Sequence, residues 1–232
     1  MSKFRHPLLM LSVLLSASAA SAAGGVKGKV TFEGKAPKGD AVKMSADAKC
    51  LEQHKGGFNF SPVTAGGKGE LAEVFVYVKT GLEGKSFDVP KDAKAILDQK
   101  GCWYYPHVSG IMVGQKLQIL NSDPTMHNVN AQPDFNAAMP AGLKPLEKSF
   151  KKAKVMFKIK CNVHPWMTAY VGVLEHPYYS VSGKDGSFEI KGLPPGKYTL
   201  EAWHEKLGSQ TKEVTVPASG GTADFKFGGS KG

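Results

Sequence analysis

Short apolar runs recur along the whole chain, separated by clusters rich in glycine, proline, asparagine and aspartate. The runs alternate apolar and polar residues or are continuously apolar, and they are rich in Val, Ile, Phe and Tyr, which is typical of β-strands. The clearest expected strands are residues 28–32, 73–78, 114–120, 154–160 and 169–174. No long segment keeps a helical period, and only residues 90–100 have the composition of one or two helical turns. We therefore expect an all-β fold.

Turn sequences divide the 232-residue chain often enough for one large β domain or two smaller ones. The clearest turns are NSDP at 121–124, GKDG at 183–186 and LPPG at 193–196. The sequence beyond the last two of these turns differs in character from the middle of the chain, so more than one domain is expected.

The first 22 residues have the pattern of a secretory signal. Lys3 and Arg5 precede an apolar run from Leu8 to Leu15, and small residues follow at 20–22. The run is shorter than the ~20 residues that a transmembrane helix needs, and no later stretch reaches that length. We expect residues 1–22 to be removed and the mature chain to be periplasmic or otherwise exported, without a membrane span.

The chain is basic, with a formal net charge of +10 that falls to +8 when Lys3 and Arg5 leave with the signal. The lysines are scattered among acidic residues, which is typical of a solvated surface; the alternative is steering toward an acidic protein partner. Arginine is nearly absent beyond the signal and no basic patch carries interleaved aromatic residues, so nucleic acid is not an expected partner.

Four residues in the middle of the chain have the chemistry of a copper site. Cys161, His164 and Met167 form a C-x-x-H-x-x-M array in the turn between two expected strands, and His127 follows an earlier strand in NSDPTMHNV. Thiolate and thioether sulfur are soft ligands and imidazole is intermediate, so this set suits copper in both oxidation states.

This array resembles the ligand set of the cupredoxins, and its spacing resembles the amicyanin-type loop. The resemblance runs from Ala93 to Glu175 and includes the G-Q-x-L-x-I-x-N-x-D lead into the first histidine. It implies a cupredoxin Greek-key β-sandwich, one type 1 (blue) copper ion cycling between Cu(I) and Cu(II), and an electron carrier rather than an enzyme. The implied ligands are His127, Cys161, His164 and Met167. A dinuclear purple centre needs two bridging thiolates, and the loop has one cysteine.

The resemblance also implies residues around the ligands. The residue after the first histidine, Asn128, is expected to direct its backbone N–H at the Cys161 sulfur, and its side chain to tie the two ligand loops together. Val163 stands where amicyanin-type loops usually have proline. This departure supplies a further N–H donor and leaves the redox potential open.

The surface for partners is expected at His164, because the loop histidine of the resembled family reaches the surface. Pro165 and Trp166 flank it here. An apolar rim lets a partner approach without desolvating charges, and weak redox encounters use small interfaces. The expected partner is a redox protein such as a cytochrome or a dehydrogenase, of acidic character.

The remaining cysteines and histidines leave two questions open. If Cys161 binds metal, Cys50 and Cys102 remain to form a disulfide in an oxidising compartment, and the alternative is two unpaired buried thiols. His107, His176 and His204 could belong to a second metal site, but none has ligand spacing with a neighbour. For His107 we expect packing or a hydrogen bond near Cys102.

The last part of the chain, GKDGSFEIKGLPPGKYTLEAW at 183–203, resembles the carboxypeptidase regulatory-like domain, a small transthyretin-like β-sandwich. The opening strands of that domain resemble GKVTFEGKAP and VFVYVKT, which precede the copper region. We expect a discontinuous sandwich of residues 23–85 with 176–232, and a cupredoxin domain of residues 86–175 inserted between. The alternative is a tandem division into 23–175 and 176–232.

Two other functions are alternatives to the electron carrier. A copper transport or storage protein would deliver the ion rather than an electron, but such proteins usually expose Met- or His-rich tracts, which this chain lacks. An exported module that binds carbohydrate or protein, with a secondary copper site, is the third reading. Reversible bleaching of an intense visible band separates the carrier from both.

Overall fold

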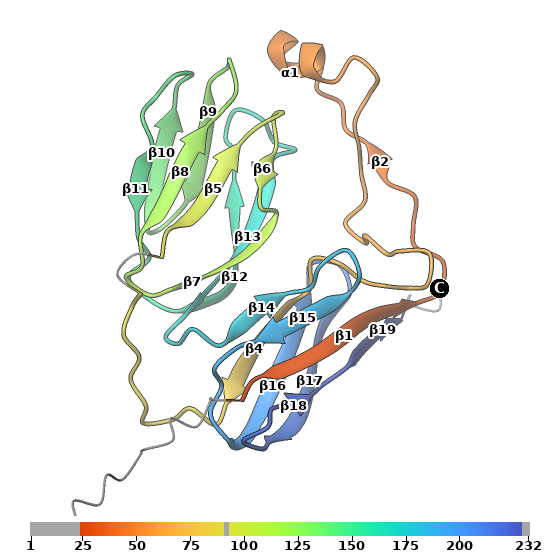
Figure 1. Ribbon diagram of the computed structural model, residues 1–232. Helices are drawn as coiled ribbons and strands as arrows, with labels where there is room; N and C mark the ends of the chain where they lie inside the picture. Colours follow the sequence, from red (N-terminus) through yellow and green to blue (C-terminus); the bar gives the residue numbers. More distant parts are fainter. Residues whose placement is uncertain (1–23, 91–92, 229–232) are drawn as a thin grey trace, which may run out of the picture.

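The computed structural model describes residues 24–90 and 93–228, and nearly all regular structure in these ranges is β (Figure 1). The expected all-β class is confirmed. One short helix, α1 (Ala48–Gln53), breaks the pattern in this part of the chain. No described helix has the length and apolar character needed to cross a bilayer. The expected signal, residues 1–22, lies outside the described residues.

The first sandwich takes its strands from both ends of the described chain. They are β1 (Val26–Glu33), β4 (Phe75–Thr80), β14 (Tyr179–Val181), β15 (Ser187–Ile190), β16 (Gly196–His204), β17 (Gly208–Val216), β18 (Gly221–Thr222) and β19 (Phe225–Gly228). One sheet has the order β15-β1-β18 with β19 also beside β1, and the other has the order β14-β4-β16-β17. Early strands therefore pair with late ones, as a discontinuous sandwich requires, while the domain boundaries stay a prediction.

The second sandwich is built from the middle of the chain. Its strands are β5 (Ala95–Gln99), β6 (Tyr104–Tyr105), β7 (Val108–Met112), β8 (Leu117–Asn121), β9 (His127–Ala131), β10 (Phe135–Met139), β11 (Leu146–Lys148), β12 (Lys154–Lys160) and β13 (Thr168–Leu174). The sheet orders are β10-β9-β12-β13-β7 and β11-β8-β5-β6. Alternate residues of these strands, such as Ile119, Val129 and Val171, fill the core between the sheets.

One expectation about this region is wrong. Residues 90–100 have a helix-like composition, but β5 occupies residues 95–99 and runs parallel to β8. Leu97 and Gln99 are both buried while their neighbours are more exposed, which is the period-two pattern of a strand. Pairing with β8 and burial of Leu97 in the core therefore override the local helical preference.

The two sandwiches meet through strands that are buried on both faces. On β4, Val76 and Val78 face the first core, whereas Phe75 and Tyr77 face a separate cluster shared with Val108 and Leu174 of the second sandwich. The alternation of a strand sends successive side chains to opposite faces, so one strand serves both cores. For this reason the apolar residues of β4 are consecutive in the sequence and do not alternate with polar ones.

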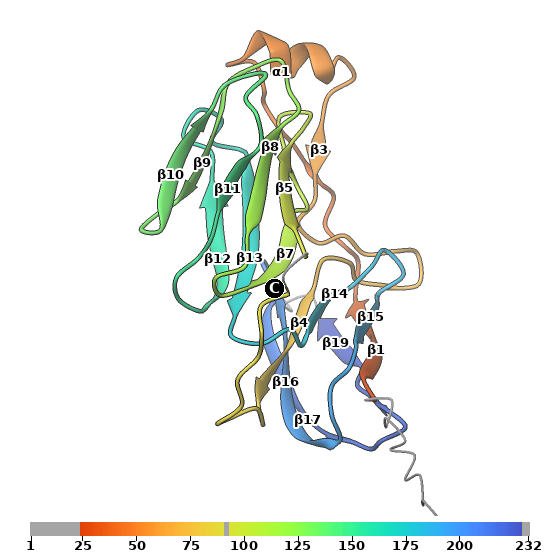
Figure 2. The ribbon, with the colours of Figure 1, turned by 60° about the vertical axis from the view of Figure 1, so that its left-hand side comes forward.

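Residues 34–70, called the strap here, leave the first sandwich after β1 and return before β4. The strap contains α1 and two short strands, β2 (Asp40–Ala41) and β3 (Asn59–Phe60), which pair only with each other. Figures 1 and 2 show that it runs along the second sandwich and places α1 at the end of that sandwich farthest from the first. The candidate site lies under α1.

Candidate metal centre

The predicted ligands come from two neighbouring connections of the second sandwich. His127 is the first residue of β9, after the β8–β9 turn, and the other three lie in the loop between β12 and β13. β9 pairs with β12 directly before that loop, through Asn130 and Lys160. Two adjacent strands therefore present both connections at one end of the sheet.

The loop between β12 and β13 closes on itself through backbone hydrogen bonds. The Cys161 N–H donates to the Met167 carbonyl at 3.2 Å, and the Met167 N–H donates to the His164 carbonyl at 2.9 Å. The His164 N–H donates to the Cys161 sulfur at 3.3 Å. These bonds fix the three side chains of the array relative to one another without the help of a metal ion.

Three ligand atoms converge on one point. The Nδ1 atoms of His127 and His164 lie 2.9 Å apart, and the Cys161 Sγ lies 3.8 Å from the His164 Nδ1. These residues form a group whose ligand atoms all lie within 4.8 Å of one another. Met167 is fully buried in the same core cluster as Cys161. The structure thus brings together His127, Cys161 and His164 and buries Met167 in the same core, and the role of all four as copper ligands stays a prediction.

A carboxylate holds the second ring nitrogen of each histidine. His127 Nε2 lies 2.8 Å from Asp123 Oδ2, and His164 Nε2 lies 3.1 Å from Asp47 Oδ2. Because a carboxylate accepts, each Nε2 carries a proton, and the Nδ1 of each ring faces the point of convergence. Carboxylates in this position orient metal-binding histidines in proteins and raise their basicity.

The two aspartates are held in turn. Asp123 accepts hydrogen bonds from the backbone N–H groups of Gly101 and Cys102, both at 2.7 Å. Asp47 caps the N-terminus of α1, accepting from the N–H groups of Lys49 and Cys50, and also accepts from the Thr125 hydroxyl. Burial would raise the pKa of Asp47, but these donors outweigh it and lower the pKa to about 2. Both carboxylates are therefore ionised at neutral pH.

The pKa of the His127 imidazole is raised. Burial would lower this pKa, but the hydrogen bonds to Asp123 and Cys161 outweigh burial and raise it to about 9. The pKa of His164 is lowered, first by burial and then by the charge of His127, against the opposing effect of Asp47. Without metal, the protonated His127 ring thus supplies the positive charge that a metal ion would otherwise supply next to the thiolate and the carboxylates.

The Cys161 thiol has a lowered pKa. Burial would raise this pKa, but His127 and nearby backbone N–H groups together lower it by more than burial raises it. The backbone N–H groups of His164, Val163 and Asn128 favour the thiolate, and that of His164 donates to the sulfur at 3.3 Å. The roles of the Val163 and Asn128 N–H groups at the sulfur stay predictions. A thiolate is the form of cysteine that binds metal.

Asn128 also links the two connections through its side chain. Its Oδ1 accepts a hydrogen bond from the Asn162 N–H at 3.2 Å, and its Nδ2 donates to Asn136 Oδ1 and to the Ala137 carbonyl. The Tyr104 hydroxyl donates to the Asn128 carbonyl. The β9 end and the ligand loop are thereby tied together, as predicted for this residue.

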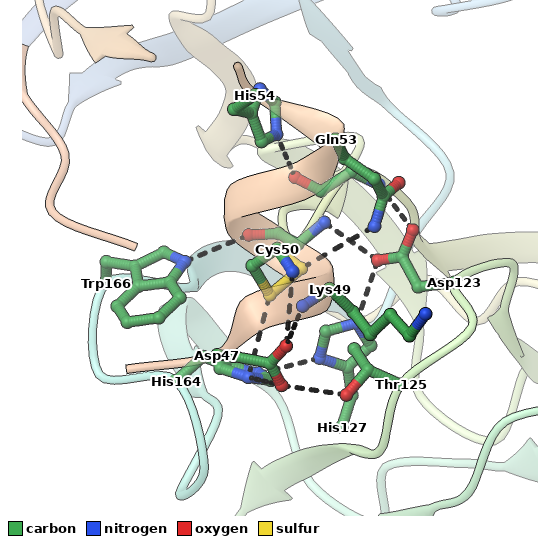
Figure 3. Close-up of a disulfide and its surroundings, with 12 residues drawn as sticks. Asp47, Lys49, Cys50, Gln53, His54, Asp123, Thr125, His127, His164 and Trp166 are labelled. Atoms are coloured by element: carbon green, nitrogen blue, oxygen red, sulfur yellow. Dashed lines mark hydrogen bonds and ion pairs between the residues drawn. A yellow bond between two sulfur atoms is a disulfide. The ribbon is translucent and has the colours of Figure 1, made fainter. Parts of the chain in front are cut away.

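A disulfide joins Cys50 to Cys102, so the predicted pairing is confirmed and the alternative of two free thiols is wrong. Its position was not predicted. Cys50 Sγ lies 3.7 Å from His164 Nε2, and Figure 3 shows the disulfide packed against both histidines. The cysteines are spaced by 52 residues, and nothing in the local sequence of Cys50 indicates that the strap reaches the centre.

The expectation that His164 reaches the surface is wrong. Its side chain is 1% exposed, because Asp47 and Cys50 of the strap cover the Nε2 edge. Trp166 is half-buried and donates from Nε1 to the Cys102 carbonyl at 3.1 Å, while Pro165 is exposed. A partner docking at Pro165 and Trp166 would therefore contact the loop beside the covered histidine rather than its ring edge.

The other histidines form no metal-ligand group with His, Cys, Asp or Glu among the described residues. His107 directs Nδ1 at the Thr168 carbonyl and Nε2 at Glu205 Oε1, at 3.0 and 2.7 Å. His204 accepts two backbone N–H bonds at Nδ1, and its buried Nε2 has no partner in the structure. His176 accepts from the Tyr178 N–H. The hydrogen bonds of His107 thus go to β13 and to the first sandwich, whereas its ring stacks on Trp103, the residue after Cys102, so the expected packing near Cys102 is confirmed.

Sequence reasoning missed Asp47 and Asp123 as partners of the centre. Asp123 carries a usable signal, because it precedes His127 by four residues in the same short connection. Asp47 carries none, because it contacts His164 from 117 residues away through the strap.

Similarity to known proteins is found among solved structures. No family model matches the chain, and no curated protein matches it. Among solved structures, a purple cupredoxin from Nitrosopumilus maritimus matches with 23% identity, covering 34% of this chain and 98% of that chain, at a TM-score of 0.31.

Two further structures match a slightly larger part of the chain. Amicyanin from Paracoccus versutus is 21% identical over 42% of this chain and 96% of that chain, at a TM-score of 0.31. A copper-containing nitrite reductase from Thermus scotoductus is 20% identical over 42% of this chain and 25% of that chain, at a TM-score of 0.32. Similarities at this level establish no family for this chain.

Proposed function

We propose that this chain is an exported protein that carries single electrons with one copper ion, held by His127, Cys161, His164 and Met167. The observation that supports it most is the convergence of His127 Nδ1, His164 Nδ1 and Cys161 Sγ, with each Nε2 held by a carboxylate. The proposal is of a carrier and not of an enzyme, because four protein ligands leave no position for a substrate.

The donor set fits copper better than the common alternatives. Zinc in structural sites takes four donors from Cys, His and carboxylate, and Mg²⁺ and Ca²⁺ take oxygen. Two imidazoles, one thiolate and a weak thioether are the donors of blue-copper sites. When bound, copper would accept and release one electron. Both carboxylates are already engaged with histidine Nε2 atoms, so they are not free to act as ligands.

The protein residues have three tasks in this proposal. Asp123 and Asp47 hold the two rings so that both Nδ1 atoms face the ion. The self-bonded loop keeps Cys161 and Met167 in place when the charge of the ion changes, which limits reorganisation. Burial of all four side chains excludes water from the site. A fixed and dry site is what rapid electron transfer requires.

The partner is proposed to be a redox protein of acidic character, such as a cytochrome or a dehydrogenase. Exposed Pro165 and half-buried Trp166 lie on the loop that carries three of the ligands. Val163 of the same loop is 41% exposed and extends this apolar surface. The lysines would speed encounter at long range, because the chain remains basic without the signal.

The test is the absorption and paramagnetic resonance spectrum of the copper-loaded protein. An intense visible thiolate-to-copper band that bleaches on reduction and returns on oxidation supports the carrier. A colourless or non-cycling copper complex would instead favour copper transport or storage. Absence of copper binding would leave the first sandwich, which resembles a regulatory-like module in sequence, as the functional part of the protein.

A further inference from the structure

Each sulfur of the disulfide lies beside one of the two candidate ligand histidines. Asp47, Cys50 and His164 form one group whose potential ligand atoms lie within 4.8 Å of one another, and Cys102, Asp123 and His127 form a second such group. A structural disulfide has no need of two imidazoles beside it. In reduced form, the same two sulfurs would add two thiolates next to the centre.

The disulfide also closes the centre. Cys50 and Cys102 are fully buried, and so are the four proposed ligands or nearly so. The tip of the strap is held over His164 by the disulfide and by the contact of Asp47 with His164, as Figure 3 shows. The ligand loop is bound to the other half of the disulfide, because Trp166 donates to the Cys102 carbonyl. Once this covalent link exists, a metal ion has to pass beneath a fixed cover.

We propose that Cys50 and Cys102, while reduced, form with His164 a loading site for one cuprous ion, and that disulfide formation then closes the cover over the filled centre. The proposal rests on the proposed copper function. An exported chain arrives with reduced cysteines and meets an oxidising compartment afterwards, so the reduced state precedes the disulfide. Copper would therefore enter before the cover is locked.

The chemistry of the donors favours Cu(I) at this position. Thiolates select Cu(I), and His164 offers Nε2 on the side of Cys50 and Nδ1 on the side of Cys161. One imidazole thus belongs to both sites, so the ion has only to move from one side of a single ring to the other. Cys102 lies in the group that contains His127, the second histidine ligand.

The protons and electrons balance in each step. Loading releases the two thiol protons and the His164 Nε2 proton to solvent, since ligands bind in deprotonated form. His164 stays a neutral imidazole, because its Nδ1 takes the proton of His127 Nδ1, which lies 2.9 Å away. As the ion moves inward, His164 Nδ1 and Cys161 give up their protons, and His164 Nε2 takes one again for its bond to Asp47. The sulfurs of Cys50 and Cys102 regain their protons when the ion leaves them. Closure then moves two electrons and two protons from these thiols to the disulfide of an oxidising protein, which becomes a dithiol. Copper remains cuprous throughout.

The loading site is tested separately from the four-ligand centre by using Cys161→Ser, which removes the thiolate of that centre. Protein purified without exposure to oxidant is compared with the same protein after disulfide formation, and thiol labelling with mass measurement verifies each state. Cu(I) affinity is measured by competition with a chromophoric Cu(I) chelator. We expect the reduced protein to bind one Cu(I) at least about tenfold more tightly than the oxidised protein.

Two controls separate this site from ordinary thiol binding. Adding Cys50→Ser and Cys102→Ser removes both sulfurs together with the disulfide, and should give the weak affinity of the oxidised protein. Adding His164→Gln should weaken the reduced protein by about tenfold, whereas His54→Gln should leave it unchanged. His54 is the matched control because its Nε2 lies 2.7 Å from the Gly101 carbonyl, beside Cys102, and it belongs to neither group.

The second measurement is the rate of copper loading in protein that keeps all four proposed ligands. Reduced wild-type protein should take Cu(I) from the chelator at least about tenfold faster than oxidised wild-type protein and than Cys50→Ser/Cys102→Ser. Equal rates for the reduced protein and the double variant, or no effect of His164→Gln, would overturn the proposal. Circular dichroism of each variant verifies the fold. Failure of the proposed function appears separately, as a missing visible band in the oxidised, copper-loaded wild type.

Discussion

The two imidazoles of the centre differ in what surrounds them. His127 is fully buried and bonded to Asp123, which is itself held by two backbone N–H groups. His164 depends on Asp47, which belongs to the strap. One ring is therefore positioned by the sandwich and the other partly by a segment that folds over it, so changes at the two aspartates have different consequences.

The sulfur residues give the most direct test of the ligand set. We expect Cys161→Ser to abolish the visible band and to leave the fold intact, because the thiolate supplies the charge-transfer transition while the core holds the sandwich. We expect Met167→Leu to keep copper bound and to raise the reduction potential, because loss of a weak axial donor disfavours the oxidised ion more. Absorption, circular dichroism and redox titration measure these effects. A retained band in Cys161→Ser, or a lowered potential in Met167→Leu, would contradict the assignment.

A second prediction concerns Asp123. In Asp123→Asn, a neutral amide replaces the carboxylate that accepts from His127 Nε2, so the ring becomes less basic. We expect copper affinity to fall by about 10- to 100-fold with the visible band retained. Asp98→Asn is a matched control, because Asp98 accepts from the Ser122 hydroxyl nearby without contacting either histidine. Affinity measured against a copper chelator should remain unchanged in the control; equal losses in both variants would point to a general effect of charge.

At the level of elements, the sequence predicts strands and turns well and their partners less well. The array from Cys161 to Met167 is local, and a loop between two adjacent strands suffices to gather its three side chains, so spacing alone indicates them. α1 was not expected, because six residues give too little periodicity to recognise. Its contact with the centre depends on how a 37-residue excursion folds back, and no local pattern encodes that path.

The contact between the sandwiches depends on two glycines that face each other on paired strands. Gly110 of β7 and Gly172 of β13 are in register, and the stacked rings of Tyr179 and Phe75 lie over them. A Cβ at Gly172 would lie 2.3 Å from the Phe75 ring, and one at Gly110 would lie 2.2 Å from the Tyr179 ring. Only glycine allows this approach.

We therefore expect Gly172→Ala to lower the free energy of unfolding by about 1–3 kcal/mol, because the Phe75 ring has to shift. Chemical denaturation measures the change. Gly56→Ala is the matched control, since a Cβ at Gly56 meets no atom within 4 Å. The same loss in both variants would show that the contact with Phe75 is not the cause.

At the level of the whole molecule, a buried ion pair joins His107 of the second sandwich to Glu205 of the first. Both nitrogens of His107 face acceptors, the Thr168 carbonyl and Glu205 Oε1, which only the protonated ring satisfies. Burial would lower the pKa of His107, but the hydrogen bond to Glu205 and the charges of Glu205 and Glu73 outweigh it and raise the pKa above its usual 6.5. The nearby His204 has a lowered pKa, mainly through burial, and adds no competing charge at neutral pH.

This pair predicts a pH dependence. A group whose pKa is higher in the folded than in the unfolded state stabilises the fold fully below the unfolded pKa, and this contribution is lost as pH rises through the folded pKa. We therefore expect the stability of the metal-free protein to fall above about pH 6.5. The fall should be smaller in Glu205→Gln, which removes the charge that raises the pKa of His107. Denaturation at a series of pH values measures it, and identical pH profiles for the two proteins would contradict this role of the pair.

The last prediction concerns the route of electrons out of the molecule. Because the strap covers His164, we expect a partner to approach through the exposed side of the ligand loop, where Pro165 and Trp166 lie. We expect Trp166→Ala to keep the visible copper spectrum and to slow transfer to an acidic cytochrome by about tenfold at every salt concentration, because a central tryptophan contributes contact rather than steering. The wild type and the variant should share one salt dependence, set by the lysines. Tyr105→Ala, which removes a 50% exposed aromatic ring outside this loop, should transfer at the wild-type rate. An unchanged rate in Trp166→Ala would place the docking surface elsewhere, with the exposed face of α1 as the next candidate.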